Sequence, residues 1–349
     1  MSDIKFGYVI SEVTPVEAIE LGILAEKRGF DSIFAPDHMM DFDACRIDPW
    51  SVLSAIGALT RRLFLSPSVT DYQRCHPAKT AHIVATLDAI TGGRAGLGIG
   101  SGEGMNTRPY GIEFEEPSIR IAKLDEAIRM IIKLWTATKN SPANYEGRYF
   151  KLVNAWLDQS SVRKPHPPIY LGAIGSSRLL ELTGELADGW LPFMNTPETY
   201  AKRFEKVKSG VAKANRKIED IDAVAMLFPS LSDAPGAQEK AVELCKIYLA
   251  SEPSMLKVLG RPLSTPPDFA YQHTLISSKA SSVVFEMSKQ VPIDLAREVA
   301  QTSTDQITET TAQFIKAGAT HIVFREIDRD PKATINKVAE KIMPYFRGN

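Results

Sequence analysis

The sequence feature that most constrains the fold is a repeated alternation between short apolar runs and longer segments of helical periodicity. Eight apolar runs are predicted to be strands, and each is followed by a predicted helix. Because βα units join parallel strands, eight of them in succession predict an α/β fold of the (β/α)8, or TIM, barrel type. The predicted strands cover residues 4–10, 31–35, 63–69, 94–100, 168–171, 189–192, 222–228 and 321–324.

Helix signals separate these strands. Thr14, Pro15 and Glu17 form a capping pattern that opens the first helix, and Gly29 ends it. The other predicted helices cover residues 50–59, 78–90, 117–135, 176–186, 197–214, 238–250 and 333–345.

Two segments interrupt the alternation. Residues 145–152 are predicted to form a small hairpin. Residues 251–292 are rich in proline, serine and other polar residues, and we expect them to be an insertion, helical in part, over one end of the barrel. The whole chain, residues 1–349, is predicted to be a single domain.

Composition and charge argue against several classes of function. The 349 residues carry a net charge of -1, so no basic surplus favours nucleic acid or anionic lipid as a partner. The three cysteines, Cys45, Cys75 and Cys245, show no spacing of a disulfide framework or zinc site. Without a signal-peptide pattern or a run of membrane-spanning length, we expect a soluble, cytoplasmic protein that acts on a small molecule.

Barrel enzymes place their sites on the loops that follow the strands, so the polar residues at the strand ends are the informative ones. Asp37 and His38 follow the second strand. An imidazole there can move a proton near neutral pH, or it can simply be fixed by local hydrogen bonds. A metal site would need a second ligand such as Asp41 or His76, but no ligand spacing links them, and no metal is expected.

The fourth strand runs into a glycine-rich loop. Ser101, Gly102 and Glu103 offer a hydroxyl, backbone donors and a carboxylate, although Glu103 could equally be a surface acid. After the fifth strand, a second loop precedes a helix whose N-terminus suits a phosphate, or is an ordinary serine-capped start. That loop holds Gly172, Ala173, Gly175, Ser176 and Ser177.

The ordered set of these segments resembles the bacterial-luciferase-like superfamily, and within it the branch that uses the deazaflavin coenzyme F420. The resemblance spans nearly the whole chain and lies closest to methylenetetrahydromethanopterin reductases and phthiodiolone ketoreductases. It is carried by residues 34–38 (FAPDH), 66–70 (SPSVT), 74–78 (RCHPA), 85–88 (ATLD), 93–103 (GRAGLGIGSGE), 145–150 (YEGRYF), 167–170 (PPIY) and 187–190 (ADGW).

The resemblance implies an oxidoreductase that transfers hydride between coenzyme F420 and a small organic substrate, either methylenetetrahydromethanopterin or a carbonyl or alcohol. It implies that His38 and Glu103 are the acid–base residues and that the Ser68–Val69 peptide bond is cis. It also implies a homo-oligomer, a dimer or tetramer. The implied cofactor-binding residues are Asp37, Ser68, Val69, Thr70, Ser101, Gly102, Gly172, Ala173, Gly175, Ser176 and Ser177.

Two alternatives stay open within the superfamily, namely an FMN-dependent monooxygenase and a barrel that binds a flavin without catalysis. One departure bears on the substrate. The related sugar-phosphate and alcohol dehydrogenases carry a tryptophan shortly after the histidine, whereas Met39, Met40, Asp41 and Phe42 stand here.

Overall fold

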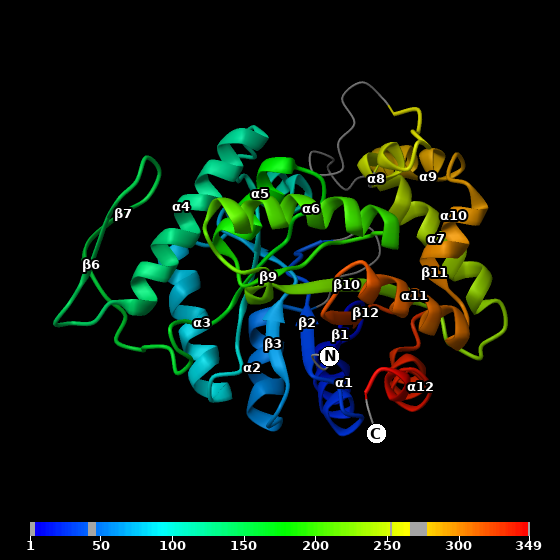
Figure 1. Cartoon of the computed structure of the whole chain (residues 1–349), viewed down its shortest axis with the longest axis horizontal. Coiled ribbons are helices and arrows are strands. Elements are labelled where there is room, and N and C mark those ends of the chain that lie inside the picture. Colours follow the sequence, from blue (N-terminus) through cyan, green and yellow to red (C-terminus); the bar gives the residue numbers. More distant parts are fainter. Residues whose placement is uncertain (1–3, 41–46, 252, 266–277, 348–349) are drawn as a thin grey trace.

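A computed structural model describes residues 4–40, 47–251, 253–265 and 278–347. Asp41, which the sequence analysis considered as a ligand, lies outside the described residues, as do residues 252 and 266–277 of the expected insertion. Figure 1 shows a central sheet surrounded by helices, with a hairpin projecting on one side and a group of helices, α7 to α10, on the other.

Parallel strands form a nearly closed barrel, which confirms the predicted fold class. Their order is β3-β2-β1-β12-β10-β9-β8-β5-β4. Strand β3 forms within the third predicted strand, and β4, which was not predicted, begins directly after it. A bridge from Leu65 to Ala95 joins β3 to the residues before β5. The strands are β1 Lys5–Val9, β2 Ser32–Ala35, β3 Phe64–Pro67, β4 Thr70–Asp71, β5 Leu97–Gly100, β8 Ile169–Leu171, β9 Gly189–Trp190, β10 Asp222–Pro229 and β12 His321–Phe324.

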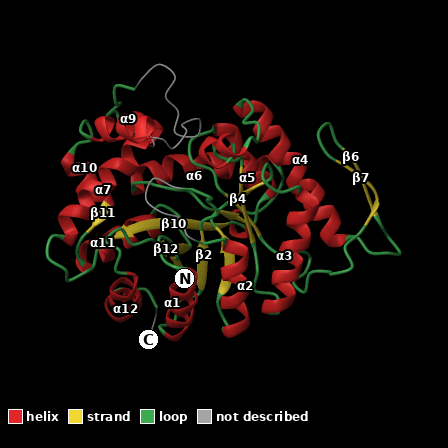
Figure 2. Cartoon of the chain, turned by 180° about the vertical axis from the view of Figure 1, so that it is seen from behind, coloured by secondary structure: helices red, strands yellow, loops and turns green. Residues whose placement is uncertain are grey.

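Helices cover the outside of the barrel, as seen from behind in Figure 2. Most begin with a side-chain cap and a proline in the first turn, where a missing N–H costs nothing. Thr14 and Glu17 form the predicted capping box. The covering helices are α1 Pro15–Lys27, α2 Pro49–Leu59, α3 Pro77–Thr91, α4 Pro117–Thr136, α5 Ser177–Leu186, α6 Pro197–Lys213, α11 Thr304–Lys316 and α12 Pro331–Lys341.

The helix that covers β10 on the outside of the barrel is not the one that the sequence predicted. Helix α7, Ala237–Ser251, forms close to the predicted 238–250, but it packs on α8, Pro253–Val258, α9, Ser278–Ser288, and α10, Ile293–Val299. Helix α11 contacts β10, α6 and α12 instead. Its buried stripe is only Ile307, Thr311 and Phe314, which is too short and polar to be recognised in the sequence.

The remaining elements are short. The predicted hairpin is confirmed as antiparallel strands β6, Ala143–Glu146, and β7, Lys151–Ala155. Strand β11, Ala300–Gln301, pairs with the end of β10 and was not predicted. Single 3₁₀ turns are η1 Gly104–Asn106, η2 Arg108–Tyr110, η3 Ile218–Asp220 and η5 Met343–Tyr345.

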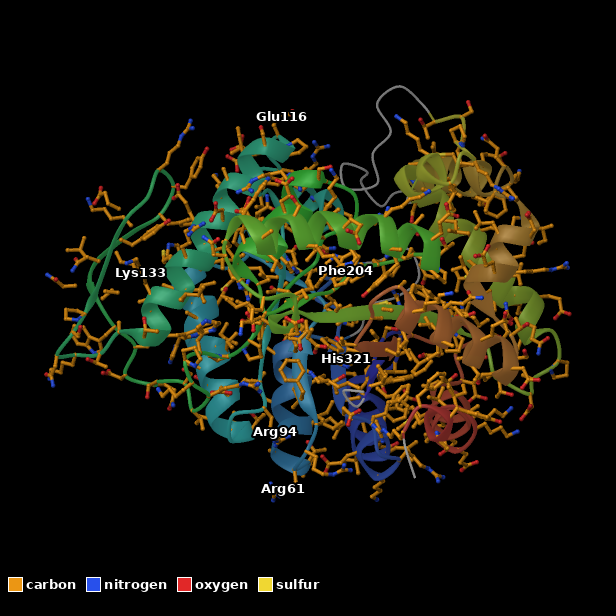
Figure 3. The ribbon with its side chains drawn as sticks, in the orientation of Figure 1. Arg61, Arg94, Glu116, Lys133, Phe204 and His321 are labelled. Atoms are coloured by element: carbon orange, nitrogen blue, oxygen red, sulfur yellow. The ribbon has the colours of Figure 1, made fainter. Side chains whose placement is uncertain are left out.

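Two apolar clusters hold the barrel together. One lies between the strands and the covering helices and includes Phe6, Trp190 and Phe204. The other fills the barrel interior and continues beneath α7 to α10, and includes Val9, Phe34 and Val323. His321, labelled in Figure 3, lies within the barrel and is 1% exposed. Within the described ranges, no helix has the length and apolar character needed to cross a membrane.

Candidate active site

A cavity of about 440 Å³ lies at the carboxyl ends of the barrel strands. It brings together predicted site residues from four separate segments, which follow β2, β3, β5 and β8, as the barrel geometry requires. Those that line it are Asp37, His38, Ser68, Val69, Thr70, Ser101, Gly102, Glu103, Gly172, Gly175 and Ser176.

Two predicted cofactor-binding residues do not line this cavity. Ala173 is fully buried, and its carbonyl oxygen accepts a hydrogen bond from the Trp190 indole at 3.0 Å. Ser177 is the exposed first residue of α5. Ala173 therefore supports the wall of the site, while Ser177 lies beside it at the helix start.

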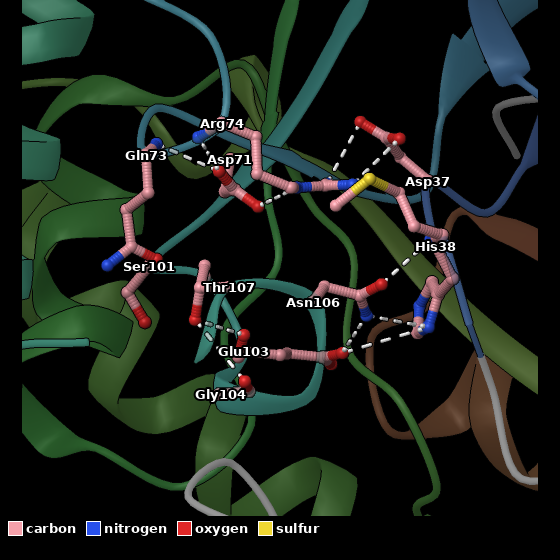
Figure 4. A network of polar contacts seen from close by, with 12 residues as sticks. Asp37, His38, Asp71, Gln73, Arg74, Ser101, Glu103, Gly104, Asn106 and Thr107 are labelled. Atoms are coloured by element: carbon pink, nitrogen blue, oxygen red, sulfur yellow. Dashed lines mark hydrogen bonds and ion pairs between the residues drawn. The ribbon is translucent and has the colours of Figure 1, made fainter. Parts of the chain in front are cut away.

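The side chains of His38 and Glu103 lie next to each other at the cavity, and Asn106 contacts both (Figure 4). The His38 Nδ1 atom is 3.8 Å from Glu103 Oε2. The Asn106 amide nitrogen is 3.3 Å from His38 Nδ1 and 3.4 Å from Glu103 Oε2. Asn106 is 2% exposed, whereas the side chains of His38 and Glu103 are 17% and 34% exposed, so the contacts are only partly shielded from solvent. The three side chains form one polar unit.

Asn106 fixes the tautomer of neutral His38. Its Oδ1 atom accepts a hydrogen bond from the backbone N–H of Met39 at 2.7 Å. The amide nitrogen must therefore face His38 and Glu103, and it can only donate. His38 Nδ1 is then the acceptor, and the proton of the neutral ring resides on Nε2. In this tautomer the imidazole can donate a hydrogen bond from Nε2.

A buried arginine joins two carboxylates on the same side of the site. Arg74 Nε donates to Asp71 Oδ2 at 2.6 Å, and its NH2 group is 3.1 Å from Asp37 Oδ2. Burial disfavours the charge on Arg74, but Asp71 and Asp37 outweigh it and raise the pKa of the guanidinium. Arg74 therefore stays charged and holds the loop after β2 against the loop after β4.

The glycine-rich loop after β5 is held by a second arginine. Arg120, on α4, is 2% exposed and donates to the carbonyl oxygens of Ser101 and Gly102, each at 3.1 Å. Its guanidinium also lies 4.0 Å from the centre of the Phe114 ring. Gly102 has a φ of 80°, and a Cβ there would meet the Gln73 side chain at 1.7 Å. Only glycine fits this position.

Val69 forms part of the cavity wall between two glycines. The Ser68–Val69 bond is cis, which confirms the expectation from the sequence. A Cβ on Gly100 or Gly172 would lie 3.0 or 2.8 Å from a Val69 methyl group. These two glycines therefore allow the Val69 side chain to pack closely against strands β5 and β8.

The opposite wall contains a charged group that the sequence analysis did not assign. Glu12 Oε1 is 3.3 Å from Arg325, at the end of β12, and accepts a hydrogen bond from the Tyr248 hydroxyl of α7 at 3.4 Å. Glu12 has a φ of 61°, which is uncommon for a residue with a side chain. Through its contacts with Arg325 and Tyr248, Glu12 links the barrel to helix α7.

Sequence reasoning missed Asn106, Arg120 and Arg325 as site residues. Asn106 lies three residues after Glu103 in a 3₁₀ turn, which brings their side chains together, but that turn was not recognised. Arg120 lies in a helix whose buried face reads as apolar in the sequence. The position of Arg325 directly after the last strand was the one signal that could have identified it.

Known proteins are similar to this chain in sequence. The family model described as luciferase-like monooxygenase matches residues 5–320. An F420-dependent glucose-6-phosphate dehydrogenase from Microbacterium testaceum is 30% identical over 99% of this chain and 98% of its own. A 5,10-methylenetetrahydromethanopterin reductase from Archaeoglobus fulgidus is 30% identical over 93% of this chain and 94% of its own.

A solved structure supports the fold. An F420-dependent secondary alcohol dehydrogenase, in complex with an F420-acetone adduct, superposes with a TM-score of 0.83 at 24% identity. The superposition covers 99% of this chain and 100% of that one.

Proposed function

The chain belongs to the luciferase-like monooxygenase family, and we propose that within it the protein is a coenzyme F420-dependent oxidoreductase that interconverts an alcohol and a carbonyl compound. Of two relatives that match nearly the whole chain, one is named an F420-dependent dehydrogenase and the other a methylenetetrahydromethanopterin reductase. The observation that carries the alcohol–carbonyl proposal is the polar unit of His38, Asn106 and Glu103 at the cavity.

The residues of the cavity fit a deazaflavin ring. The Ser68 hydroxyl is buried, lines the cavity and has no protein partner, so a polar ring atom would satisfy it. Gly100, Gly102 and Gly172 bring bare backbone to the same wall. Ser68, Val69, Thr70, Ser101 and Gly102 would hold the ring from this side.

The start of α5 fits the phosphate of the coenzyme. The first N–H groups of a helix have no partner within the helix, and they attract anions. Gly175 and Ser176 line the cavity, and the Ser176 hydroxyl caps the helix by accepting from Leu179 N–H at 3.3 Å. Ser177, exposed at the first helical position, adds a second hydroxyl beside this terminus.

The protein's own task in the reaction is to move a proton at the substrate oxygen. When bound, coenzyme F420 exchanges hydride with the substrate carbon, so oxidation of an alcohol is matched by reduction of the deazaflavin. Loss of hydride from the carbon leaves the hydroxyl proton to be removed. The Glu103 carboxylate is the group that accepts it in this direction and returns it in the other, while the His38 Nε2–H group donates a hydrogen bond to the same oxygen.

A second substrate class follows from the reductase relative. An iminium form of a methylene-pterin accepts hydride without a proton at oxygen. In that case His38 would have little effect on the rate, and Glu103 would act mainly in orienting the pterin. The two classes therefore differ in how strongly they depend on His38.

The experiment that tests the proposal starts with the cofactor. Purified protein is titrated with F420 and, separately, with FMN, and binding is followed by quenching of cofactor fluorescence. The loaded protein then receives alcohols or a methylene-pterin, with the deazaflavin absorbance recorded over time. We expect F420 to bind more tightly than FMN and an alcohol to bleach its absorbance. Preferential FMN binding, with oxygen consumption, would support the monooxygenase alternative instead.

A further inference from the structure

A buried arginine lines the cavity on the side away from the proposed coenzyme wall. Arg325 follows β12 directly and is 9% exposed. In the barrel order β12 lies between β1 and β10, whereas β4, β5 and β8 carry the wall that we assigned to the deazaflavin. A guanidinium can only donate hydrogen bonds, so the group that meets Arg325 in the cavity must be an acceptor.

Three side chains hold the guanidinium of Arg325 in place. Its NH2 atom is 3.3 Å from Glu12 Oε1, and the ring centres of Phe193 and Tyr248 lie 5.7 and 5.4 Å away. Its Nε atom is buried and makes no hydrogen bond to the described part of the protein. A buried donor without an acceptor is costly, and an oxygen atom of a molecule in the cavity would satisfy it.

The backbone around Arg325 is strained. Five residues with side chains have positive φ in the described ranges, and two of them are asparagines, which tolerate this conformation. The other three are Glu12, Met194 and Arg329. Glu12 pairs with Arg325, Met194 follows Phe193, and Arg329 is 3.9 Å from Glu12. Strained residues concentrate where proteins bind ligands, which indicates a binding role for this side of the cavity.

Arg325 lies within reach of a small molecule that also reaches His38. Only β1 separates β12 from β2, the strand that His38 follows. Two strand spacings place the ends of β2 and β12 about 10 Å apart. Because the side chains of His38 and Arg325 both line the cavity, a molecule of a few carbon atoms can span the gap between them.

We propose that Arg325 binds a second oxygen of the substrate, separate from the oxygen that reacts beside His38 and Glu103. The substrate is then an alcohol or carbonyl compound that carries a further hydroxyl, carbonyl, carboxylate or phosphate oxygen, rather than a simple alkanol. The inference rests on the proposed function and makes its substrate class more specific.

The direct test compares three substrates. Butan-2-ol, butane-1,3-diol and 3-hydroxybutyrate share a carbon chain and a secondary hydroxyl, and the last two carry a further oxygen group at the end of the chain. We expect wild-type kcat/KM for the diol or the hydroxy acid to exceed that for butan-2-ol by at least about tenfold, as a hydrogen bond to a charged group allows. Which of the two is preferred shows whether the second oxygen is neutral or anionic.

A variant assigns this preference to Arg325. Arg325→Met keeps an unbranched side chain but removes the donors, so the advantage over butan-2-ol should fall below about twofold, mainly through KM. F420 affinity should stay within about twofold, because the coenzyme is assigned to the other wall. A purely structural role would lower kcat/KM for all three substrates alike. A preference that survives in Arg325→Met would overturn the inference.

Arg329→Met is the matched control. Arg329 contacts the same carboxylate, Glu12, but its side chain is 67% exposed and does not line the cavity. We expect this variant to keep the wild-type preference among the three substrates. Loss of the preference in both variants would show that the charge balance at Glu12, and not contact with Arg325, sets it. Urea unfolding shows that both variants are folded.

A binding measurement decides the matter if none of the three compounds is turned over. Each is titrated calorimetrically into the F420-loaded wild-type protein, and the diol or the hydroxy acid should bind more tightly than butan-2-ol. Equal affinities, or no saturable binding by any of the three, would overturn the inference. If F420 itself fails to bind, the proposed function is wrong. If F420 binds and no preference is found, only the inference fails.

Discussion

At the scale of single residues, the site depends on side chains whose roles are set by their neighbours. His38 and Glu103 were visible in the sequence because each follows a predicted strand. Asn106 was not, since only the 3₁₀ turn brings it between them. Its contacts with both side chains and with the Met39 backbone make it a positioning residue for the proton transfer.

Replacing Asn106 tests this role. Asn106→Ala removes the donor that selects the His38 tautomer, so we expect kcat to fall by about 10-fold or more, with a smaller effect on KM. The pH profile of kcat should also shift, because the neutral ring can then carry its proton on either nitrogen. Asn144→Ala, in the exposed hairpin, is the matched control. An unchanged profile in Asn106→Ala would contradict the assigned role.

A second buried group lies inside the barrel, at the opposite end of the strands. Asp222 accepts hydrogen bonds from Tyr170 at 2.6 Å and Thr320 at 3.0 Å, and pairs with His321 at 3.1 Å. His321 in turn contacts Ser32 at 2.8 Å. These residue types occur in hydrolases, but Ser32 is fully buried and does not line the cavity. The group therefore stabilises the barrel.

Removing the Asp222 charge should destabilise the fold. Burial alone would raise the pKa of Asp222, but His321, Lys5 and Tyr170 outweigh it and hold the pKa well below its usual range. Breaking a buried ion pair lowers the free energy of unfolding by about 3–5 kcal/mol. Because Lys5 reaches solvent, we expect the loss in Asp222→Asn to lie in the lower part of this range. Urea unfolding measures the loss.

The pH dependence has a defined sign. Because the pKa of Asp222 is depressed in the folded state, its contribution is complete above the unfolded value of about 3.9 and is lost as the pH falls below it. The difference between wild type and Asp222→Asn should therefore be constant near neutral pH and shrink in acid. Asp233→Asn, at an exposed ion pair, should leave the urea midpoint unchanged. A difference that grows in acid would contradict this account.

At the scale of elements, two helices position the proposed cofactor loops. Helix α4 holds the glycine-rich loop through Arg120, and α5 begins beside the cavity. The sequence predicted both helices to within a residue or two, because the proline that begins α4, the serine that caps α5 and their apolar stripes are local signals. It could not predict the contact of Arg120 with the loop, which depends on how α4 packs.

The contact from α4 can be weakened without removing the charge. Arg120→Lys keeps a cation but loses the planar set of donors that reaches several carbonyl oxygens. We expect F420 affinity to fall by about tenfold, because the loop is less fixed before binding. Arg129→Lys changes an exposed residue of the same helix and serves as the control. Equal F420 affinities in the two variants would show that Arg120 does not order the loop.

The helix start of α5 tests the proposed phosphate site. Replacing Ser176 and Ser177 together with glutamate places two carboxylates where a phosphate would bind, so F420 affinity should fall by about 100-fold or more. The control pair, Ser303→Glu and Thr304→Glu, alters the capped start of α11 in the same way, away from the cavity. Retained affinity in the Ser176 and Ser177 variant would place the phosphate elsewhere.

At the scale of the whole molecule, local sequence patterns predicted the barrel and most residues at its mouth. All eight predicted strands form. They could be recognised in the sequence because each apolar run is followed by a clear helix signal. The packing of α7 on α9 and α10 was not predicted, since an apolar helix face does not reveal what it will contact. Likewise, the pairing of Glu12 with Arg325 joins residues from the loops that follow the first and last strands, which no local pattern relates.

The central claim is that Glu103 moves the proton that accompanies hydride transfer to or from F420, while His38 is hydrogen-bonded to the same substrate oxygen. The most direct measurement compares turnover of an alcohol by wild type, His38→Ala and Glu103→Gln, with F420 affinity determined for each. The account predicts that turnover falls by about 10²–10⁴-fold while F420 affinity stays within about tenfold. Full turnover in a variant that lacks both side chains would contradict it.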